Sequence, residues 1–393
     1  MNAQNSIDSR ILSILHVLTL NGRNGEYGGP VRVAREISKE LTKRGHLVEI
    51  FSGARQGSEP AKSGASVESY VYVRPILGAL PVSSLWSFKI IPTLWKKIRE
   101  IEIVHIHFAR DLIPMAAAII CLIKRKPFVT QTHGMIISDG RLSTKIIDFL
   151  FTKPLLNRSQ VTLVLTQIEF DQLQKIQIKA RIELLPNGIA VQDETQQQNR
   201  DGMNRIIFCS RLQKRKGIDK FVDLAEYFSS SPENYVFEIY GPDGGELQTT
   251  QEAIRSRKLD NIVYKGSLTP EEVSGVLSNS DLLVLPSKDE PFPMVVIEAL
   301  AVGTPVLVMP TCGLAEKLFS FNPNFVARTP DLNGIIFSFK AQKRSWSPRQ
   351  SSEIRDTCIK NFSITEVVDV LQVMYEESIE TCYRIMNTHG NIE

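Results

Sequence analysis

The sequence lacks the features that define several protein classes. Its five cysteines are scattered along 393 residues without Cys-x-x-Cys spacing, which is typical of a reducing compartment without structural zinc. The longest apolar stretch, residues 112–123, is too short to span a bilayer. The net charge of only +3 gives no overall field for binding nucleic acid. The first ten residues are polar and include an acid, so we expect no secretory signal and a cytoplasmic protein.

Recognisable metal-binding patterns are also missing. No Asp-x-Asp motif is present that could clamp a metal ion against a diphosphate. His105 and His107 lie two residues apart in a predicted strand, and therefore on one face, but the sequence places no third ligand near them. We therefore predict that the protein uses no metal and no other cofactor.

What the sequence contains is two series of alternating strand and helix patterns. The chain is too long for one average domain, and its 42% hydrophobic and 23% charged residues are ordinary for a globular protein. The predicted strands of the first series are 11–20, 47–53, 101–108, 127–134, 161–166 and 180–189; those of the second are 205–212, 235–241, 262–268, 281–287 and 304–310. Strands that alternate with helices indicate parallel sheets, so we predict two doubly wound α/β halves facing each other across a cleft.

Composition indicates where these halves begin and end. Residues 190–204 are polar, rich in glutamine and without periodicity, which is typical of a linker. We therefore expect a Rossmann-like N-terminal domain at 1–189 and a second one at 205–363. A long helical pattern at 364–386 follows, with no strand left to pair with it.

Unusual polar and glycine residues follow many of the predicted strands. Ligands of doubly wound sheets bind outside the carboxyl ends of the strands, so these positions are candidates for one site shared by the two halves. The candidates of this kind are Gly28, Gly29, His133, Asn187, Arg211, Lys216 and Glu290.

The second half places charges of both signs after its strands. Arg211 and Lys216 lie between a strand and a helix, where two cations and a helix N-terminus suit a diphosphate; a solvated basic loop is the alternative. Glu290 and Glu298 flank the start of a later helix and can accept hydrogen bonds from sugar or ribose hydroxyls. The alternative for Glu298 is an ordinary glutamate on a helix surface. The amides of Phe292, Met294 and Val295 are available at the same helix start.

A basic segment with interleaved aromatic residues occupies 83–100. Its members are Trp86, Phe88, Trp95, Lys89, Lys96, Lys97 and Arg99, with Pro92 expected to interrupt the pattern. Such a mixture suits the surface of an anionic membrane. An ordinary helix with one core-facing and one solvated basic face explains the segment equally well.

Taken together, the motifs resemble those of the large retaining glycosyltransferase family 4, which has the GT-B fold. The resemblance covers nearly the whole chain and includes "GGPVRVAREISKELTKRGHLVEIF", "VHIH", "THG", "LPNGI", "SRLQKRKGID", "YGPDGGE" and "KDEPFPMVVIEALAVGTPVL". The spaced glutamates are specific when they occur with the upstream Arg and Lys. Two departures are the Pro291-Phe292-Pro293 stretch, where the family usually has glycines, and Ser210, where it often has glycine.

The resemblance implies a function and roles for seven residues. Arg211 and Lys216 would bind the diphosphate of a nucleotide sugar, Glu290 the transferred sugar, and Glu298 the ribose, while His133 would lie beside that sugar. Gly28 and Gly29 match a loop near the phosphates and the acceptor.

The implied reaction is retaining glycosyl transfer to a glycan or lipid-linked acceptor in cell-surface polysaccharide biosynthesis, at the inner face of the membrane if residues 83–100 bind it. The C-terminal helix would cross back to the first domain. A nucleotide-sugar epimerase and a non-catalytic nucleotide-sugar-binding subunit are the alternatives.

Overall fold

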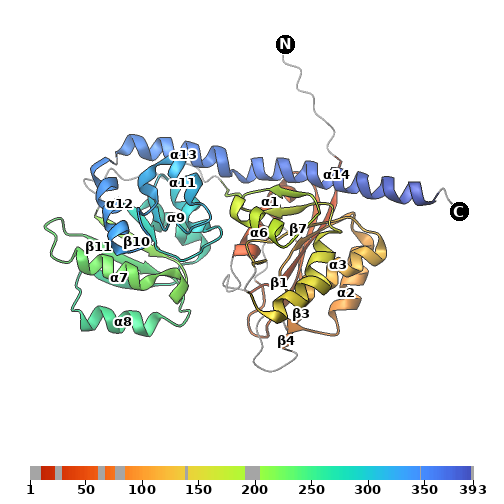
Figure 1. Ribbon diagram of the computed structural model, residues 1–393, viewed down its shortest axis with the longest axis horizontal. Helices are drawn as coiled ribbons and strands as arrows, with labels where there is room; N and C mark the ends of the chain where they lie inside the picture. Colours follow the sequence, from red (N-terminus) through yellow and green to blue (C-terminus); the bar gives the residue numbers. More distant parts are fainter. Residues whose placement is uncertain are drawn as a thin grey trace, which may run out of the picture. The chain divides into compact units, whose positions relative to one another are not determined.

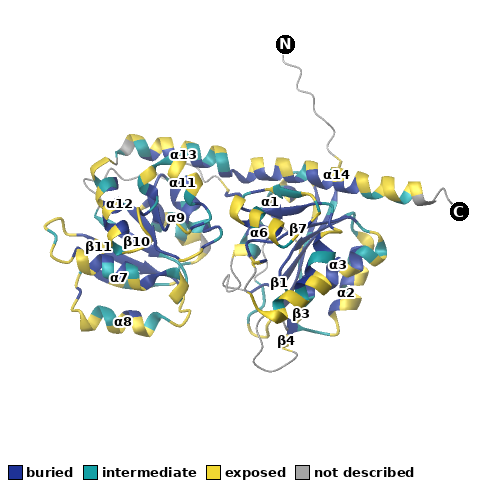
Figure 2. Cartoon of the chain, viewed as in Figure 1, coloured by how far each residue is buried: buried dark blue, intermediate teal, exposed yellow. Residues whose placement is uncertain are grey.

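The computed structural model describes residues 10–22, 29–60, 67–75, 85–137, 140–190, 204–345 and 347–390. These divide into two compact units, one formed by Met1–Gly188 with Ile364–Glu393 and the other by Ile189–Ser363. Most of the expected linker, 190–204, lies outside the described residues. Each unit has a buried parallel sheet between helices, which confirms the two α/β halves of the expected fold (Figures 1 and 2).

The first unit is built on a seven-stranded sheet in the order β3-β2-β1-β6-β7-β8-β9, with all neighbouring strands parallel. Its strands are β1 (Ser13–Leu20), β2 (Leu47–Ala54), β3 (Val67–Tyr72), β6 (Ile103–His107), β7 (Phe128–Gln131), β8 (Thr162–Val164) and β9 (Ile182–Leu184). The predicted strand at 180–189 is thus much shorter, and β3 was not predicted. Strands β4 (Arg74–Pro75) and β5 (Leu85–Trp86) form a separate antiparallel pair.

The two faces of this sheet differ in chemistry. One face carries a large apolar core in which Val17 and Ile106 pack beneath helices α2 and α3. The opposite face is covered by α1, whose Val31 and Ala34 contact Ile50. The helices of the unit are α1 (Gly29–Lys43), α2 (Ile90–Glu100), α3 (Leu112–Lys124), α4 (Leu142–Ile147), the π-helical turn η2 (Asp148–Thr152), α5 (Lys153–Leu156), α6 (Gln167–Lys175) and α14 (Ile364–Gly390).

Helix α14 is the last helix of the chain but belongs to the first unit. Arg44, which follows α1, forms an ion pair with Asp369 at 2.6 Å and donates a hydrogen bond to the Thr365 carbonyl. Tyr375, fully buried, reaches the sheet beneath. The first unit is therefore completed by a segment about 180 residues later in the chain than its last strand.

The second unit has a five-stranded sheet in the order β12-β11-β10-β13-β14, again parallel. Its strands are β10 (Arg205–Cys209), β11 (Val236–Tyr240), β12 (Ile262–Gly266), β13 (Leu282–Leu285) and β14 (Val306–Val308). Its helices are η3 (Lys214–Lys216), α7 (Ile218–Tyr227), α8 (Leu247–Ser256), α9 (Pro270–Ser278), α10 (Met294–Ala301), α11 (Ala315–Phe321), η4 (Pro323–Phe325), α12 (Leu332–Ser345) and α13 (Pro348–Phe362).

Candidate functional site

In the second unit, three loops meet at the carboxyl ends of β10, β13 and β14. The Lys288 N–H donates to the Arg215 carbonyl at 2.8 Å, which joins the loops after β13 and β10. The Gly313 N–H donates to the Glu290 carbonyl at 2.8 Å, which joins the loops after β14 and β13. Because β13 lies between β10 and β14 in the sheet, these bonds bring residues 73 and 23 positions apart together on one surface.

This surface holds a buried ion pair between two of the predicted site residues. The Lys216 ammonium lies 2.6 Å from Glu290 Oε2, and both side chains are largely shielded from solvent. The Arg215 guanidinium approaches the same carboxylate oxygen at 3.8 Å. A lysine ammonium has three N–H donors, so Lys216 can keep this contact and still bind a phosphate oxygen.

The start of α10 offers backbone donors beside Glu290. The amides of Phe292, Met294 and Val295 have no hydrogen-bond partner among the residues that the structure describes. Pro293 adopts an extended conformation and precedes the first helical residue. Pro291 and Pro293 therefore lack amide donors, but they lie outside the helix and do not interrupt it. Unpartnered amides at a helix N-terminus suit an anion or a hydroxyl oxygen.

Two glycines allow the loops of this surface to pack closely. At Gly217, where φ is +72°, an added Cβ would lie 2.2 Å from the Pro286 carbonyl oxygen. At Gly241, where φ is +140°, it would lie 1.9 Å from the Ser210 carbonyl oxygen. Any larger residue would push apart the loops that carry Arg211 and Lys216.

The remaining predicted residues of this surface have different surroundings. Arg211 and Glu298 are half-buried, and Glu298 lies one helical turn after Met294 on α10. Asn187 is 3% exposed and belongs to the first unit. It precedes Gly188, where an added Cβ would lie 2.7 Å from the Ile364 Cα, so Asn187 lies beside the point where the chain returns to the first unit.

In the first unit, His133 lies in a constrained loop after β7. His133 and Gly134 both have positive φ, at 51° and 71°, an uncommon conformation for histidine. The buried Glu169 holds this loop, because its carboxylate accepts hydrogen bonds from the Thr132 hydroxyl, the Gly134 N–H and, at 2.8 Å, the Leu165 N–H. Burial raises the pKa of Glu169, while these hydrogen bonds lower it in part. Glu169 was not predicted as a site residue, because the sequence does not show which residues its carboxylate contacts. Its hydrogen-bond partners are 4, 35 and 37 positions away.

Four histidine rings stack behind this loop. The ring centroids of His16 and His105 are 4.8 Å apart, those of His105 and His107 4.7 Å, and those of His107 and His133 5.0 Å. Burial lowers the pKa of His16 and of His133 to about 3. Burial also lowers the pKa of His105 and His107 well below the usual value, and neighbouring histidines lower it further. All four rings are therefore neutral at pH 7.

The histidine stack is not a metal centre in the described part of the chain. No group of three or more His, Cys, Asp or Glu side chains there is arranged to hold a metal ion. His105 and His107 share one face of β6, as predicted, and they stack with His16 and His133, which the sequence did not place beside them.

The glycine loop before α1 is only partly described. Gly28 lies outside the described residues. Gly29 is the first residue of α1, and an added Cβ there would meet no atom within 4 Å. The space around Gly29 is therefore open within its own unit.

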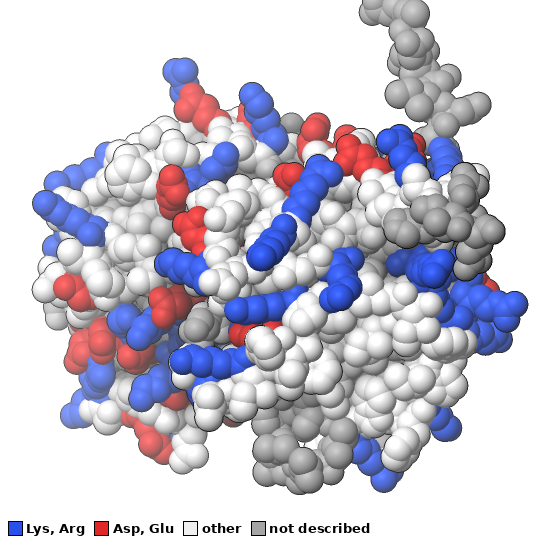
Figure 3. All heavy atoms as spheres, turned by 45° about the vertical axis from the view of Figure 1, so that its right-hand side comes forward, with Lys and Arg blue, Asp and Glu red and all other residues white. Residues whose placement is uncertain are grey.

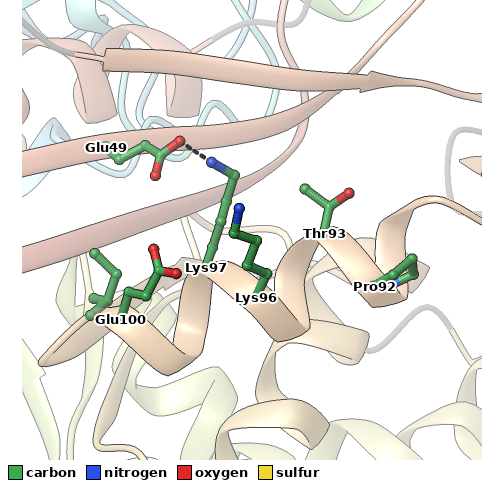
Figure 4. Close-up of a pocket in the computed structure, with 7 residues that line it drawn as sticks. Glu49, Pro92, Thr93, Lys96, Lys97 and Glu100 are labelled. Atoms are coloured by element: carbon green, nitrogen blue, oxygen red, sulfur yellow. Dashed lines mark hydrogen bonds and ion pairs between the residues drawn. The ribbon is translucent and has the colours of Figure 1, made fainter.

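A pocket on α2 is separate from all these residues. Its lining includes Pro92, Lys96 and Glu100 of α2 together with Glu49 of β2, and contains none of the predicted site residues. Lys97 forms an ion pair with Glu49 across it (Figure 4). We therefore place the candidate site at the carboxyl ends of the strands and not in this pocket.

The fold and these side chains define a class of protein: two parallel α/β units, one of which carries cations, a carboxylate and free helix amides suited to a nucleoside diphosphate sugar. Comparison with protein families identifies the class more closely. Residues 27–193 match the model described as Glycosyltransferase Family 4, and residues 191–336 match the model described as Glycosyl transferases group 1. The chain belongs to this family of glycosyltransferases, which use nucleotide-sugar donors.

Curated relatives of similar length are distant in sequence. An uncharacterized protein of the cps region of Klebsiella pneumoniae is 20% identical over 75% of this chain and 84% of its own length. The Bacillus subtilis glycosyltransferase TuaC, named for teichuronic acid biosynthesis, is 23% identical over 78% of this chain and 80% of its own length.

Solved structures confirm the GT-B fold. Sucrose-phosphate synthase of Thermosynechococcus elongatus superposes with a TM-score of 0.70 at 17% identity, covering 94% of this chain and 99% of that one. HepE of Anabaena, solved with UDP and glucose, gives a TM-score of 0.70 at 16% identity, covering 92% and 98%. Among the described residues, no helix is long and apolar enough to cross a membrane.

Proposed function

We propose that the protein transfers a glycosyl group from a nucleoside diphosphate sugar to a glycan or lipid-linked acceptor, with retention at the anomeric carbon. The observation that carries the proposal is the Lys216–Glu290 pair beside the unpartnered amides of α10. It combines a cation for phosphate with a carboxylate for sugar hydroxyls at the carboxyl edge of a doubly wound sheet.

The charges of the second unit suit the leaving group of such a reaction. As the glycosidic bond to the diphosphate breaks, negative charge grows on the phosphate oxygens. Arg211, Lys216 and the α10 amides stabilise that charge, and they stabilise it more in the transition state than in the bound donor. Glu290 accepts hydrogen bonds from the transferred sugar, and Glu298 accepts them from the ribose.

Retention is implied by the resemblance to the family, and the lack of a suitable nucleophile near these groups disfavours a covalent route to it. Among the described residues of this surface, the only carboxylate close to Lys216 is Glu290, and that carboxylate is already engaged in an ion pair. We therefore favour a same-face substitution in which the departing phosphate accepts the proton of the acceptor hydroxyl. This route requires no metal and no covalent intermediate.

The class of acceptor rests on distant similarity and on two surfaces of the first unit. The Klebsiella and Bacillus relatives are named for a capsule gene region and for teichuronic acid, both cell-surface polymers. A polymer or lipid-linked acceptor at the inner face of the cell membrane fits those names. It would place the protein in the cytoplasm, at least partly bound to the membrane.

The surface that would contact an anionic membrane includes α2. Pro92 lies in the first turn of α2 and so does not interrupt the helix, contrary to the sequence prediction. The helix buries one face, while Phe88, Ile91 and Trp95 remain exposed, Phe88 at 92%. Lys97 is engaged by Glu49, so Lys89, Lys96 and Arg99 are the cations left for lipid headgroups. Figure 3 shows Lys and Arg side chains bordering broad uncharged areas of the surface.

A second apolar segment follows the His133 loop in the same unit. Its exposed members are Leu142, Ile146, Phe149, Leu150 and Phe151. The single acid between residues 140 and 158, Asp148, is buried and paired with Arg110 at 2.8 Å, so it does not repel anionic lipid. This segment supports a lipid-facing role for the first unit.

The test is a transfer assay with a panel of nucleoside diphosphate sugars and lipid-linked acceptors in excess EDTA. We expect one donor to give a product whose anomeric configuration, read by NMR, matches that of the donor. Activity that vanishes with EDTA and returns with magnesium or manganese would contradict the metal-free mechanism. An isomerised sugar without acceptor would favour an epimerase, and donor binding without turnover on any acceptor a binding subunit.

A further inference from the structure

The first unit buries polar rings where a sheet normally buries aliphatic side chains. His16 of β1 pairs in register with His105 of β6, so the two side chains share a sheet face with His107. The alternate residues Val17 and Ile106 belong to the apolar core on the other face. Burying unpaired polar groups is costly, so these rings require hydrogen-bond partners.

Three of the rings form a continuous hydrogen-bonded chain. His133 Nε2 lies 2.7 Å from His107 Nδ1, and His107 Nε2 lies 3.1 Å from His16 Nδ1. The fourth ring, His105, is outside this chain, because its Nδ1 pairs with the Tyr375 hydroxyl at 2.6 Å. Among the described residues, Nδ1 of His133 has no partner, so it is the end of the chain that a ligand can reach.

The chain restricts where each proton can lie. A neutral imidazole has one N–H donor and one lone pair, and His107 uses both nitrogens. Both hydrogen bonds must therefore point in the same direction along the chain. Either His133 Nδ1 carries a proton and donates outward, or it carries a lone pair and accepts.

The inner end of the chain distinguishes the two directions. His16 Nε2 is buried and has no hydrogen-bond partner among the described residues. If the chain ran inward, this nitrogen would carry an unpaired N–H; if it runs outward, it carries only an unpaired lone pair. Buried N–H groups without an acceptor are rarer in proteins than under-satisfied acceptors. The outward direction, with a proton on His133 Nδ1, is therefore favoured.

We propose that His107 and His16 are positioning residues that hold His133 as a neutral Nδ1–H donor to a hydroxyl oxygen of the transferred sugar. The proposal rests on the proposed glycosyl transfer and assigns a role to a stack that the reaction otherwise leaves unused. Glu169 holds Thr132 and Gly134 on either side of His133, and the hydrogen-bonded histidines fix the orientation and the proton of its ring.

A neutral donor suits this reaction. Breaking the bond to the leaving diphosphate develops positive charge on the sugar ring. A protonated histidine beside that ring would repel the charge, whereas a neutral N–H can orient a hydroxyl without repulsion. Because His16, His107 and His133 are all buried, the charged form of each ring is disfavoured.

The first experiment needs no substrate. The wild-type protein, labelled with ¹⁵N in its histidines, is studied by NMR at pH 7, with a His133→Asn variant to assign the His133 signals. We expect a protonated Nδ1 and an unprotonated Nε2 for His133 and for His107. A proton on His133 Nε2, or averaging between the two tautomers, would overturn the proposal whether or not a transfer assay succeeds.

The second experiment measures transfer by three variants of β6. His107→Leu removes both hydrogen bonds that link His133 to His16. It should lower kcat about tenfold, with the donor KM within about twofold of wild type. His107→Asn places an amide nitrogen near the Nδ1 position and should restore kcat to within about threefold. His105→Leu is the matched control, since it removes a buried ring of the same stack but no member of the chain, and it should keep kcat within about twofold.

Folding of each variant is checked by its thermal transition, because all three sites are buried. Equal losses in His107→Leu and His107→Asn, or an equal loss in His105→Leu, would reduce the stack to a structural role. A folded His107→Leu protein with wild-type kcat would exclude positioning by His107.

Discussion

The two units of the protein prepare their candidate residues in opposite ways. In the second unit, Lys216 and Glu290 are charged and neutralise each other at 2.6 Å. In the first unit, His133 is one of four stacked rings that burial keeps uncharged. The difference follows the charge of the reaction: permanent charges suit the diphosphate, whereas an uncharged hydrogen-bond donor suits a sugar that becomes positive.

The largest effect should come from acid. Burial lowers the histidine pKa values in the folded state, so below pH 6.5 the unfolded state binds more protons and stability is lost as pH falls. Each fully buried neutral histidine costs about 2 kcal/mol at pH 5, and the four together up to about 8 kcal/mol. Urea unfolding of a Trp346→Phe variant, followed by the fluorescence of Trp86 and Trp95, reports on the first unit.

The control for this prediction is His105→Phe, which keeps an aromatic ring in the stack but removes one titrating group. It should weaken the dependence of the unfolding free energy on pH between 7 and 5. A first unit that is equally stable at both pH values would mean that the rings are protonated or solvated.

Removing the cation of the second unit should have the next largest effect. Lys216→Met keeps the length of the side chain but removes its charge, and should lower kcat about a hundredfold, or about 3 kcal/mol, with a smaller loss of donor affinity. The reason is that charge on the diphosphate grows toward the transition state. Single-turnover rates and donor Kd values separate the two effects.

Lys216→Met also leaves Glu290 without its closest partner, so the double variant Lys216→Met/Glu290→Gln is needed. If the single variant lost activity only through the unpaired carboxylate, the double variant would recover it. We expect no recovery, since Glu290 has its own role with the sugar.

Glu298 should behave differently from Lys216. Ribose hydroxyls do not change charge during transfer, so Glu298→Gln should raise the donor Kd about tenfold, or about 1.4 kcal/mol, and leave kcat nearly unchanged. Calorimetric titration with the donor and steady-state kinetics provide the two values. A fall in kcat as large as that of Lys216→Met would show that the roles are misassigned.

Membrane contact should give the smallest effect per residue. Replacing Phe88 and Trp95 by serine should weaken binding to vesicles of anionic lipid about tenfold, and raising the salt concentration should weaken it further. A matched variant, Phe149→Ser/Leu150→Ser, tests the segment after the His133 loop. If the wild-type protein does not bind anionic vesicles at low salt, a membrane-binding role is excluded for both surfaces.

Much of the second unit's surface could be predicted from sequence, because its chemistry is local. Arg211 and Lys216 are five residues apart, and Glu290 lies four residues before the first residue of α10. The strands next to these residues are apolar runs, and parallel sheets bring their carboxyl ends together. Only the direct contact between Lys216 and Glu290 needed the structure, since it depends on β10 and β13 being neighbours.

The histidine chain could not be predicted for the same reason. His16 and His107 are 91 positions apart and His107 and His133 are 26 apart, and the strand order β1-β6-β7 brings the three together. The sequence placed His105 and His107 on one face of a strand, but it did not show that the His16 ring lies beside them. Tyr375, which satisfies His105, comes from a helix more than 250 residues further along the chain. Helices α12 and α13 were likewise not predicted individually.

The diphosphate site of the second unit is tested most directly by a thermal shift screen of nucleotides in excess EDTA, comparing wild type with Lys216→Met. Ligands that bind the folded state raise its melting temperature. We predict that one nucleoside diphosphate raises the melting temperature of wild type more than its monophosphate does, and that Lys216→Met loses this difference. Equal shifts for monophosphate and diphosphate in wild type, or a difference that survives Lys216→Met, would contradict the assignment of the diphosphate site to the second unit.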